Sequence, residues 1–439
     1  MEDNKFRLSI LSIFDNTLKL TWLASLLIIT NFAIIVKKIN EFNLNININL
    51  LLIISLSLFI IVVFIYYLVI YRISRYEITN DMVVTYKNIF VKDRKEILIK
   101  NIANICVSQN IFERIFKLTR MEIYANERNK MFCDFEVILN RKNYDRYILP
   151  FLEDNDFKYT NNAEESFIKF KIRDIVKHSI LSIPISSIIV IINFIMLLFT
   201  MFQNGSLLKE ISYNFLGLII TLVGFIFPVI YSVAKNLIKY LNYYVKRKNK
   251  NIYVSFGIFT KKLYIIPVSK INGLIADVSL LCAIFGCYKL NVITSGIGDS
   301  KNKLSMLFPI MKKKKCINIL KLILPEYEIP LKNKNQASKS LVVFGTKIII
   351  LMLMLVIPCI YINIKIALLI SLSLLILTFI IYLIKRIVIL DKYICVINGI
   401  FLKRLQIIRY EKIENVNIRD GIISKQMGIC KVYISILGN

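Results

Sequence analysis

Side chains that could perform acid–base or phosphate chemistry are few in this chain of 439 residues. The only histidine, His178, stands beside Lys177 at the start of an apolar segment, where an interfacial role is favoured over catalysis. The segment 295–299 (Ser-Gly-Ile-Gly-Asp) is glycine-rich like a phosphate loop, but it lacks the Gly-Lys-Ser/Thr ending that holds nucleotide phosphates. These residues therefore favour neither an acid–base catalyst nor a nucleotide site.

Thiol chemistry is the next class to consider, because the chain has eight cysteines: Cys106, Cys133, Cys282, Cys287, Cys316, Cys359, Cys395 and Cys430. They form no CxxC pair, and no histidine lies at the spacing of a zinc site. We interpret them as reduced core or interface residues in a cytoplasmic setting. The sequence thus predicts no metal, no cofactor and no enzymatic activity.

Cations are the abundant chemical group, with 58 Lys and Arg residues against 29 Asp and Glu residues, a formal net charge of +29. This charge suits nucleic acid or anionic lipid, and the long apolar segments favour lipid. Adjacent turns can direct ammonium and guanidinium donors onto one phosphate, although a solvated lysine-rich turn is the commoner outcome. The candidate contact residues are Lys246, Arg247, Lys248 and Lys250 in one hairpin, Lys261 and Lys262 after the next turn, and Lys312, Lys313, Lys314 and Lys315 at a helix start.

The elements that must position these cations begin with membrane segments, since 56% of the residues are hydrophobic. Six uncharged windows are each close to the length of about 20 residues that crosses a hydrocarbon core. They cover residues 20–36, 50–71, 179–201, 211–234, 348–364 and 366–384. We predict six transmembrane helices in three pairs, with an uncleaved first helix.

The distribution of basic residues predicts the orientation of these helices. The three connections within pairs contain only Lys37, Lys38, Lys209 and Lys365 of the 58 basic residues. Because Lys and Arg accumulate on the cytoplasmic side, we place the amino terminus and the segments after each pair in the cytoplasm. That rule alone also accounts for many of the lysines without any specific lipid site.

A short phrase recurs after each pair, as residues 88–92 (Asn-Ile-Phe-Val-Lys), 257–261 (Gly-Ile-Phe-Thr-Lys) and 399–403 (Gly-Ile-Phe-Leu-Lys). From its Phe it is 12 residues to Ile102, Ile271 and Ile413, and 14 more to Phe116, Phe285 and Met427, without a gap. One folding unit is therefore used three times. Its first residue, Asn88, Gly257 or Gly399, fits a turn position with positive φ, where glycine and then asparagine are best tolerated.

The middle copy predicts a small antiparallel β domain with a closing helix. Strands are expected over 243–248, 252–256, 262–268, 288–294 and 304–308, and a helix over 311–324. The firmest motifs are the Gly-Ile-Phe turn, Ile266-Pro267, Lys270-Ile271 and Phe285-Gly286. In their order the chain resembles the bacterial membrane-flanked PH-like domain family, of the YdbT type. The resemblance implies a pleckstrin-homology-like β-barrel capped by a C-terminal helix, without catalysis.

The predicted fold class is an α+β membrane protein with three transmembrane pairs, each followed by one PH-like domain. The expected order is 1–71 N-terminal segment and pair 1, 72–155 domain 1, 156–178 linker, 179–239 pair 2, 240–327 domain 2, 328–340 linker, 341–384 pair 3 and 385–439 domain 3. The third copy reaches Asn439 before its last strands and helix, so we expect an incomplete barrel or one that another element completes.

Two functions fit this organisation. The favoured one is a non-enzymatic scaffold that presents PH-like domains to the anionic inner leaflet or to protein partners, including a homo-oligomer, with envelope stress or defence as a candidate setting and no nucleic acid as partner. The alternative is a transporter or channel component whose repeats are cytoplasmic support. The scarcity of charged residues inside the predicted spans weighs against a pathway.

Overall fold

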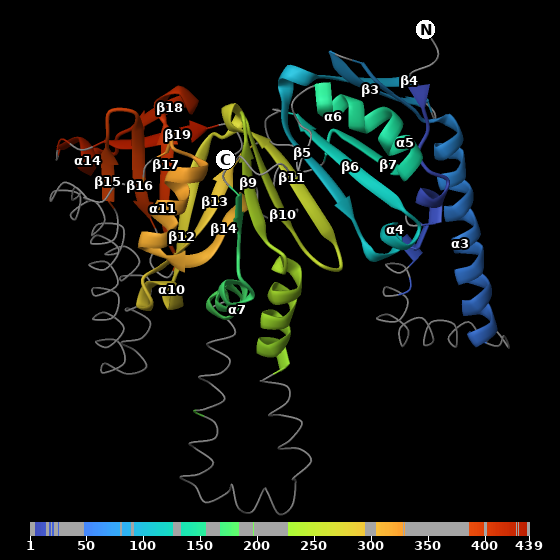
Figure 1. Cartoon of the computed structure of the whole chain (residues 1–439), viewed down its shortest axis with the longest axis horizontal. Helices are drawn as coiled ribbons and strands as arrows, with labels where there is room; N and C mark the ends of the chain where they lie inside the picture. The colour runs from blue at the N-terminus through green and yellow to red at the C-terminus, as the bar shows by residue number, and fades with distance from the viewer. Residues whose placement is uncertain are drawn as a thin grey trace, which may run out of the picture. The chain divides into compact units, whose positions relative to one another are not determined.

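A computed structural model of the whole chain shows antiparallel β-sheets accompanied by helices (Figure 1). It describes residues 5–14, 48–125, 133–154, 167–183, 227–294, 304–329 and 386–436, with short gaps at 80, 89–91, 328, 399–401, 427 and 429, and a few single residues within 17–25 and at 196. The chain forms two compact units. Unit 1 comprises residues 1–126, 132–161 and 260–265, and unit 2 comprises 127–131, 162–259 and 266–439.

Helix α3 (Ile48–Ile73) is the one described helix that is long and apolar enough to cross a membrane, over Leu56–Ile73. Its apolar side chains are largely uncovered, as Leu58 is 63% and Ile61 is 57% exposed. It coincides with the second predicted span. The other five windows lie wholly or largely outside the described residues, so six spans in three pairs remain a prediction.

The first sheet of unit 1 has the order β1-β2-β3-β4, with all neighbours antiparallel. Its strands are β1 (Lys5–Phe6), β2 (Arg75–Ile78), β3 (Met82–Asn88) and β4 (Lys92–Leu98), and η1 (Ile99–Asn101) follows. Val83 and Val84 are buried on β3. Strand β4 has a polar sequence, Lys-Asp-Arg-Lys-Glu-Ile-Leu, and it is the edge of this sheet among the described residues.

The second sheet of unit 1 contains β5 (Ile102–Gln109), β6 (Leu118–Ala125), β7 (Phe135–Asn140) and residues 261–265 of β11 (Lys261–Pro267). Alternate apolar residues such as Ile105, Met121 and Ile123 are fully buried, as the period of a half-covered strand requires. Short helix α4 (Ile111–Ile115) joins β5 to β6. The first repeat also ends in a closing helical segment, which is divided into α5 (Arg141–Asn143), the π-helical η2 (Tyr144–Ile148) and α6 (Leu149–Asp154).

Unit 2 begins with strand β8 (Phe167–Lys169) and helix α7 (Ile172–Leu181), and a second helix covers residues 227–240. Strand β9 (Tyr244–Lys248) pairs with β8 on one side and with β10 (Asn251–Phe256) on the other. Asn249, between β9 and β10, has a φ of 50°, which suits asparagine in a tight turn. The predicted hairpin is therefore present within one residue at each strand end.

A six-stranded antiparallel sheet joins the second and third repeats, in the order β14-β13-β12-β17-β16-β15. The second repeat contributes β12 (Gly273–Ser279), β13 (Cys287–Ile293) and β14 (Leu304–Lys312), and the third contributes β15 (Arg386–Ile389), β16 (Tyr393–Asn398) and β17 (Leu402–Arg409). At the joint, β12 and β17 pair over seven residues, from Gly273 opposite Ile408 to Ser279 opposite Leu402. The sequence pattern alone does not predict this pairing between repeats.

Short elements complete unit 2. Helix α10 (Leu280–Ile284) joins β12 to β13. The closing helix α11 (Lys313–Ile323) begins two residues later than predicted, because β14 continues to Lys312. It buries Cys316, Ile319, Leu320 and Ile323. Two 3-10 turns, η3 (Val268–Lys270) and η4 (Tyr410–Lys412), separate the two halves of their repeats.

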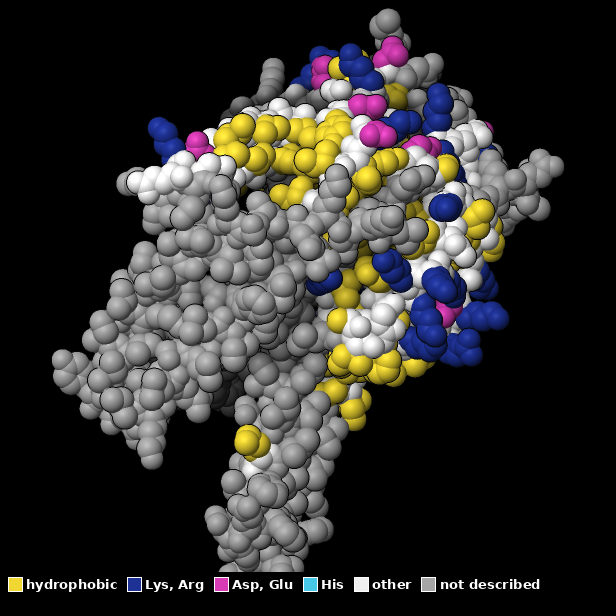
Figure 2. Space-filling model, turned by 90° about the vertical axis from the view of Figure 1, so that its left-hand side faces the viewer, with side chains coloured by type: hydrophobic (Ala, Val, Ile, Leu, Met, Phe, Trp, Pro, Cys, Tyr) yellow, Lys and Arg dark blue, Asp and Glu magenta, His cyan; other side chains and the backbone are white. Residues whose placement is uncertain are grey.

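The end of the described chain is a two-stranded sheet, β18 (Ile413–Arg419) and β19 (Lys431–Ile436), linked through α14 (Ile422–Gln426). Ile436 is buried with Ile275, Ile293 and Ile408, but Ile418 is 64% exposed. The equivalent residue of the second repeat, Ala276, is fully buried. Figure 2 shows hydrophobic side chains gathered on the side of the molecule to which these strands belong. The third repeat therefore leaves apolar surface uncovered among the described residues.

Candidate membrane-contact tips

The connection between β12 and β13 is a compact tip with an apolar end. The Ser279 hydroxyl accepts a hydrogen bond from the Cys282 N–H at 3.2 Å, which caps α10. At the other end of α10, Gly286 has a φ of 59°, a left-handed conformation that turns the chain sharply into β13. Between these two points the side chains of Ile284 and Phe285 are 76% and 61% exposed.

Lysines lie beside this tip because α11 begins next to it. The Lys313 N–H donates to the Gly286 carbonyl at 3.2 Å, and the Lys313 ammonium is 5.9 Å from the centroid of the Tyr288 ring. Lys312 and Lys314 are exposed, and Lys315 pairs with Asp174 of α7 at 3.0 Å. Positive charge at a helix amino terminus opposes the helix dipole, so this lysine run does not stabilise α11.

The same tip is hydrogen-bonded to the end of α7, and Figure 1 shows α10 and α7 at the same end of unit 2. The Ser279 hydroxyl donates to the carbonyl of Leu181, the last residue of α7, at 3.2 Å. The Leu181 side chain packs against the buried cluster of Val278, Cys282, Cys287 and Ile310. The third predicted span, 179–201, starts at this point of the chain.

The first repeat has an equivalent tip at α4. Here Asn110 and Glu113 form a capping box, with hydrogen bonds of 2.7 and 2.8 Å between each side chain and the other's N–H. Phe112, Ile115 and Phe116 are 59%, 66% and 52% exposed. Basic side chains again lie nearby. Arg114 and Lys117 of the tip and Arg141 of α5 line one pocket of about 330 Å³.

A left-handed residue follows the tip helix in all three repeats. Lys117 has a φ of 52°, Gly286 of 59° and Gly428 of 68°. Each directly follows one of the equivalent residues Phe116, Phe285 and Met427. Each copy therefore turns through a left-handed residue at the equivalent position, although the first copy places a lysine where glycine is favoured.

The cations predicted in the β9–β10 hairpin form a different arrangement. Lys246 is only 4% exposed, and Arg247 makes two hydrogen bonds to the Glu326 carboxylate, of 2.6 and 3.0 Å, and one to the Ile323 carbonyl. Burial opposes ionisation of Glu326, but the Arg247 hydrogen bonds outweigh it and lower the pKa of that carboxyl. Because Ile323 ends α11 and Lys313 begins it, the hairpin and the lysine run are separated by about 15 Å of helix.

The remaining predicted residues are placed as follows. Lys248 is half-buried, Lys250 is exposed, and Lys261 and Lys262 lie on β11 opposite Gln109 and Ser108. Of the three predicted turn residues, Gly257 has a φ of 100°, Asn88 ends β3 opposite Lys92, and Gly399 lies outside the described residues. The structure therefore brings Lys312 to Lys315 together with an apolar tip, and it does not bring them to the hairpin cations.

His178 and the buried cysteines lie inside the packed domains. His178 is 1% exposed, its Nδ1 accepts from the Ile310 N–H at 3.3 Å, and burial lowers its pKa to about 3. The interfacial position predicted for it is wrong, because α7 packs on β14. Burial also raises the pKa of Cys106 and of Cys316 to about 12, so these thiols stay protonated. Among the described residues, no group of His, Cys, Asp and Glu could hold a metal ion.

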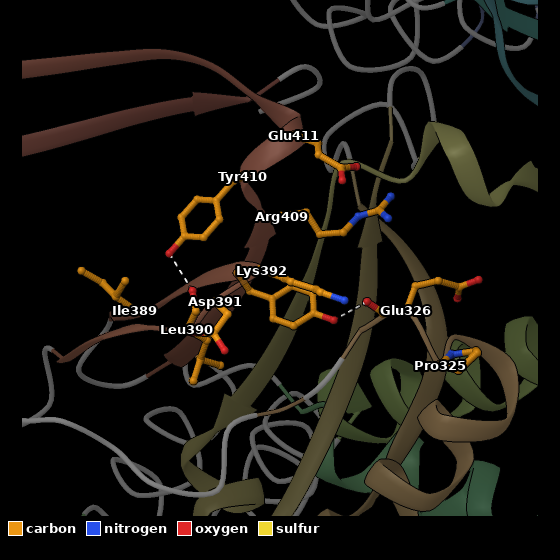
Figure 3. A pocket seen from close by; sticks show the side chains of 10 residues that line it. Pro325, Glu326, Ile389, Leu390, Asp391, Lys392, Arg409, Tyr410 and Glu411 are labelled. Atoms are coloured by element: carbon orange, nitrogen blue, oxygen red, sulfur yellow. Dashed lines mark hydrogen bonds between the residues drawn. The ribbon is translucent and has the colours of Figure 1, made fainter.

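A pocket of about 810 Å³ lies beside the first hairpin of the third repeat (Figure 3). Its lining mixes both signs of charge, with Lys392 and Arg409 near Glu326, Asp391 and Glu411. The Tyr393 hydroxyl donates to the Glu326 carbonyl at 2.6 Å, and the Tyr410 hydroxyl donates to the Leu390 carbonyl at 2.8 Å. The first bond links the hairpin to the chain after α11, and the second links it to η4, which makes the pocket a structural junction.

Comparisons with known proteins agree with the three repeats. The family model for the bacterial PH domain matches residues 20–145, 180–341 and 340–438. A curated relative, the UPF0699 transmembrane protein YdbT of Bacillus subtilis (strain 168), is 27% identical over 132 residues. The match covers 29% of this chain and 27% of that protein. No solved structure matches the chain.

Proposed function

Because the chain belongs to the bacterial PH domain family, we propose that it is a non-enzymatic membrane scaffold whose PH-like repeats contact an anionic bilayer through the α4 and α10 tips. The supporting observation is the combination at α10 of two exposed apolar side chains, Ile284 and Phe285, with the lysine run 312–315. Apolar residues that enter the headgroup region, flanked by lysines that face lipid phosphates, are the chemistry of interfacial membrane binding.

The position of the α10 tip supports this proposal. Its hydrogen bond to Leu181 places it where the chain passes from α7 toward the predicted third span. With the third span as predicted, the tip would lie within reach of lipid headgroups without any movement of the domain. Each nearby lysine is attracted to an anionic leaflet by about 1 kcal/mol, and the attraction falls off within a Debye length. The Lys and Arg distribution favours the cytoplasmic leaflet.

Contact of more than one tip with the bilayer would allow individually weak contacts to hold the scaffold at the membrane surface. No single tip has the convergent, buried cation cluster of a tight phosphate site in the part of the chain that the structure describes. Two tips on one polypeptide raise the effective concentration of each for the surface, so that modest contacts add to a stable orientation. The scaffold would then hold the repeats at a fixed height above the leaflet, with their other faces free for protein partners.

Depth-dependent quenching in reconstituted protein tests the proposal. In a Trp22→Phe background, Phe285→Trp places the only tryptophan at the α10 tip, and brominated lipids in anionic bilayers should quench it strongly. Phe167→Trp, an exposed ring on β8, is the matched control and should be quenched weakly. Replacing Lys312, Lys313 and Lys314 by Ala should reduce quenching at position 285 in anionic more than in neutral bilayers. Equal quenching at positions 285 and 167 would contradict the proposal.

A further inference from the structure

Neighbouring repeats are joined by the same strand pairing at two places. In unit 1, β5 of the first repeat pairs with β11 of the second, and Ile105 lies opposite Ile265. In unit 2, β12 of the second repeat pairs with β17 of the third, and Leu274 lies opposite Ile407. Ile105 and Leu274 each stand three residues after the equivalent Ile102 and Ile271, and Ile265 and Ile407 each stand six after the shared Phe. The register is therefore identical at both joints.

Among the described residues, one half of this joint is left without its partner in the first repeat and the other half in the third repeat. Strand β4 is the first repeat's equivalent of β11 and β17, and among the described residues it pairs only with β3. Strand β18 is the third repeat's equivalent of β5 and β12, and it pairs only with β19 in the described chain. An open strand edge presents backbone donors and acceptors that a complementary strand can use.

We propose that β18 of one copy of this chain pairs with β4 of a second copy, in the register already used twice within the chain. That register places Val416 opposite Glu96 and Arg419 opposite Asp93. The complementary half of the joint is present in every copy, so no other protein is needed to supply it. The contact is head-to-tail, and repetition of it gives a ring where the rotation closes and a filament where it does not.

Charge complementarity supports this occupant. At the β12–β17 joint, Asp277 lies opposite Arg404, and the two side chains form an ion pair of 3.1 Å. Arg419 and Asp93 occupy the equivalent positions of β18 and β4, so the same pair recurs with the charges exchanged between strands. Both side chains are exposed, and the Arg419 guanidinium rests 5.4 Å from the centre of the Tyr433 ring. Opposite charges directly across a strand pair favour this register over its neighbours.

Disulfide trapping between two differently tagged copies of the full chain tests the pairing. One copy has Glu96→Cys, the other has Val416→Cys, and both have Cys430→Ser because that native thiol is exposed. Residues directly opposite in an antiparallel pair have Cα atoms about 4.5–5.5 Å apart, within the range of a disulfide. Oxidation of the co-expressed, reconstituted copies should give a dimer that contains both tags.

The matched control moves one cysteine by one residue. Asn417→Cys in place of Val416→Cys directs the thiol to the opposite face of the strand, so dimer yield with Glu96→Cys should fall at least about fivefold. Absence of the mixed dimer, or equal yield from positions 416 and 417, would overturn the proposal.

Charge exchange gives a second, independent measurement. Arg419→Asp alone and Asp93→Arg alone should each weaken self-association by roughly two- to fivefold, as expected for an exposed ion pair. The double variant, with both charges exchanged, should restore it, which a folding defect would not do. The readout is the molar mass in nanodiscs or mild detergent across protein concentration. A wild-type chain that stays monomeric at all concentrations, or a double variant as weak as the single ones, would refute the proposal.

Discussion

At the scale of single residues, buried polar groups hold the domains together more than they perform chemistry. His178 is the best example, because its Nδ1 accepts a hydrogen bond from the Ile310 backbone and its ring packs edge-on against Tyr240 at 5.1 Å. Burial, with Lys289 and Lys239 nearby, keeps the imidazole neutral. A neutral acceptor inside a domain makes the stability of that domain sensitive to acid.

We predict a pH dependence of stability from this residue. The pKa of His178 is lowered from 6.5 to about 3 in the folded state, so the unfolded state binds the proton first as the pH falls. Stabilisation is complete above pH 6.5 and is lost progressively toward pH 3. Between pH 7 and 4.5 the loss is on the order of 2 kcal/mol. Thermal unfolding in detergent should show a smaller decrease for His178→Asn, whose amide oxygen can accept the same bond but does not titrate here. Identical pH profiles would exclude this role.

Residue by residue, the sequence predicts some of the site. The sequence predicts the lysine run at 312–315 as a contact at a helix start, and the structure has this run at the start of α11. The exposure of the hairpin candidates is harder to predict. Successive side chains of β9 point to opposite faces, and whether the face that carries Lys246 is buried depends on which other elements cover it. The exposure of Ile284 and Phe285 could not be predicted, since apolar residues in a short turn are more often buried. The recurrence of Phe116 and Phe285 at one spacing was the available clue.

At the scale of elements, the tip turns illustrate how one backbone accommodates different sequences. The three tips share a left-handed residue after the short helix, and in the first repeat that residue is Lys117. An L-residue pays a steric cost in this conformation of about 1–2 kcal/mol, whereas glycine does not. Glycine in turn loses more conformational entropy on folding, so the net difference is smaller.

Lys117→Gly should therefore stabilise unit 1 by about 0.5–1 kcal/mol, and Gly286→Ala should destabilise unit 2 by a similar amount. Nothing lies within 4 Å of a Cβ built at Gly286, so the effect of the second variant reports the backbone and not a clash. Chemical denaturation of detergent-solubilised protein measures both changes. A destabilised Lys117→Gly variant would show that its side chain contributes more than its backbone costs.

At the scale of the whole molecule, the compact structural units differ from the sequence repeats. Strand hairpins such as β9–β10 can be predicted from local patterns, because their turn and their alternation are close in sequence. The β5–β11 and β12–β17 joints cannot, because backbone hydrogen bonds set them between segments more than 100 residues apart. Residues 260–265 consequently belong to unit 1, although their repeat is the second.

Hydrogen exchange should reveal these units. Ile105→Ala removes a fully buried side chain of β5, a change that costs about 2–5 kcal/mol. Faster exchange is expected in residues 261–265 as well as in β5, with little change in β12 and β17. Ile275→Ala, at 2% exposure on β12, is the reciprocal variant and should accelerate exchange in β17 while leaving 261–265 protected. Exchange that follows the boundaries of the sequence repeats in both variants would contradict this division.

The identical register of the two joints also bears on how such a protein can change over evolution. The number of residues from Phe90 to Phe259 differs from the number from Phe259 to Phe401. The strands of neighbouring repeats nevertheless pair in the same register at both joints. A duplication or deletion of one whole repeat would therefore leave each remaining joint with two strands that pair in this register. Repeat number is therefore a variable that can be altered in single steps without redesigning an interface.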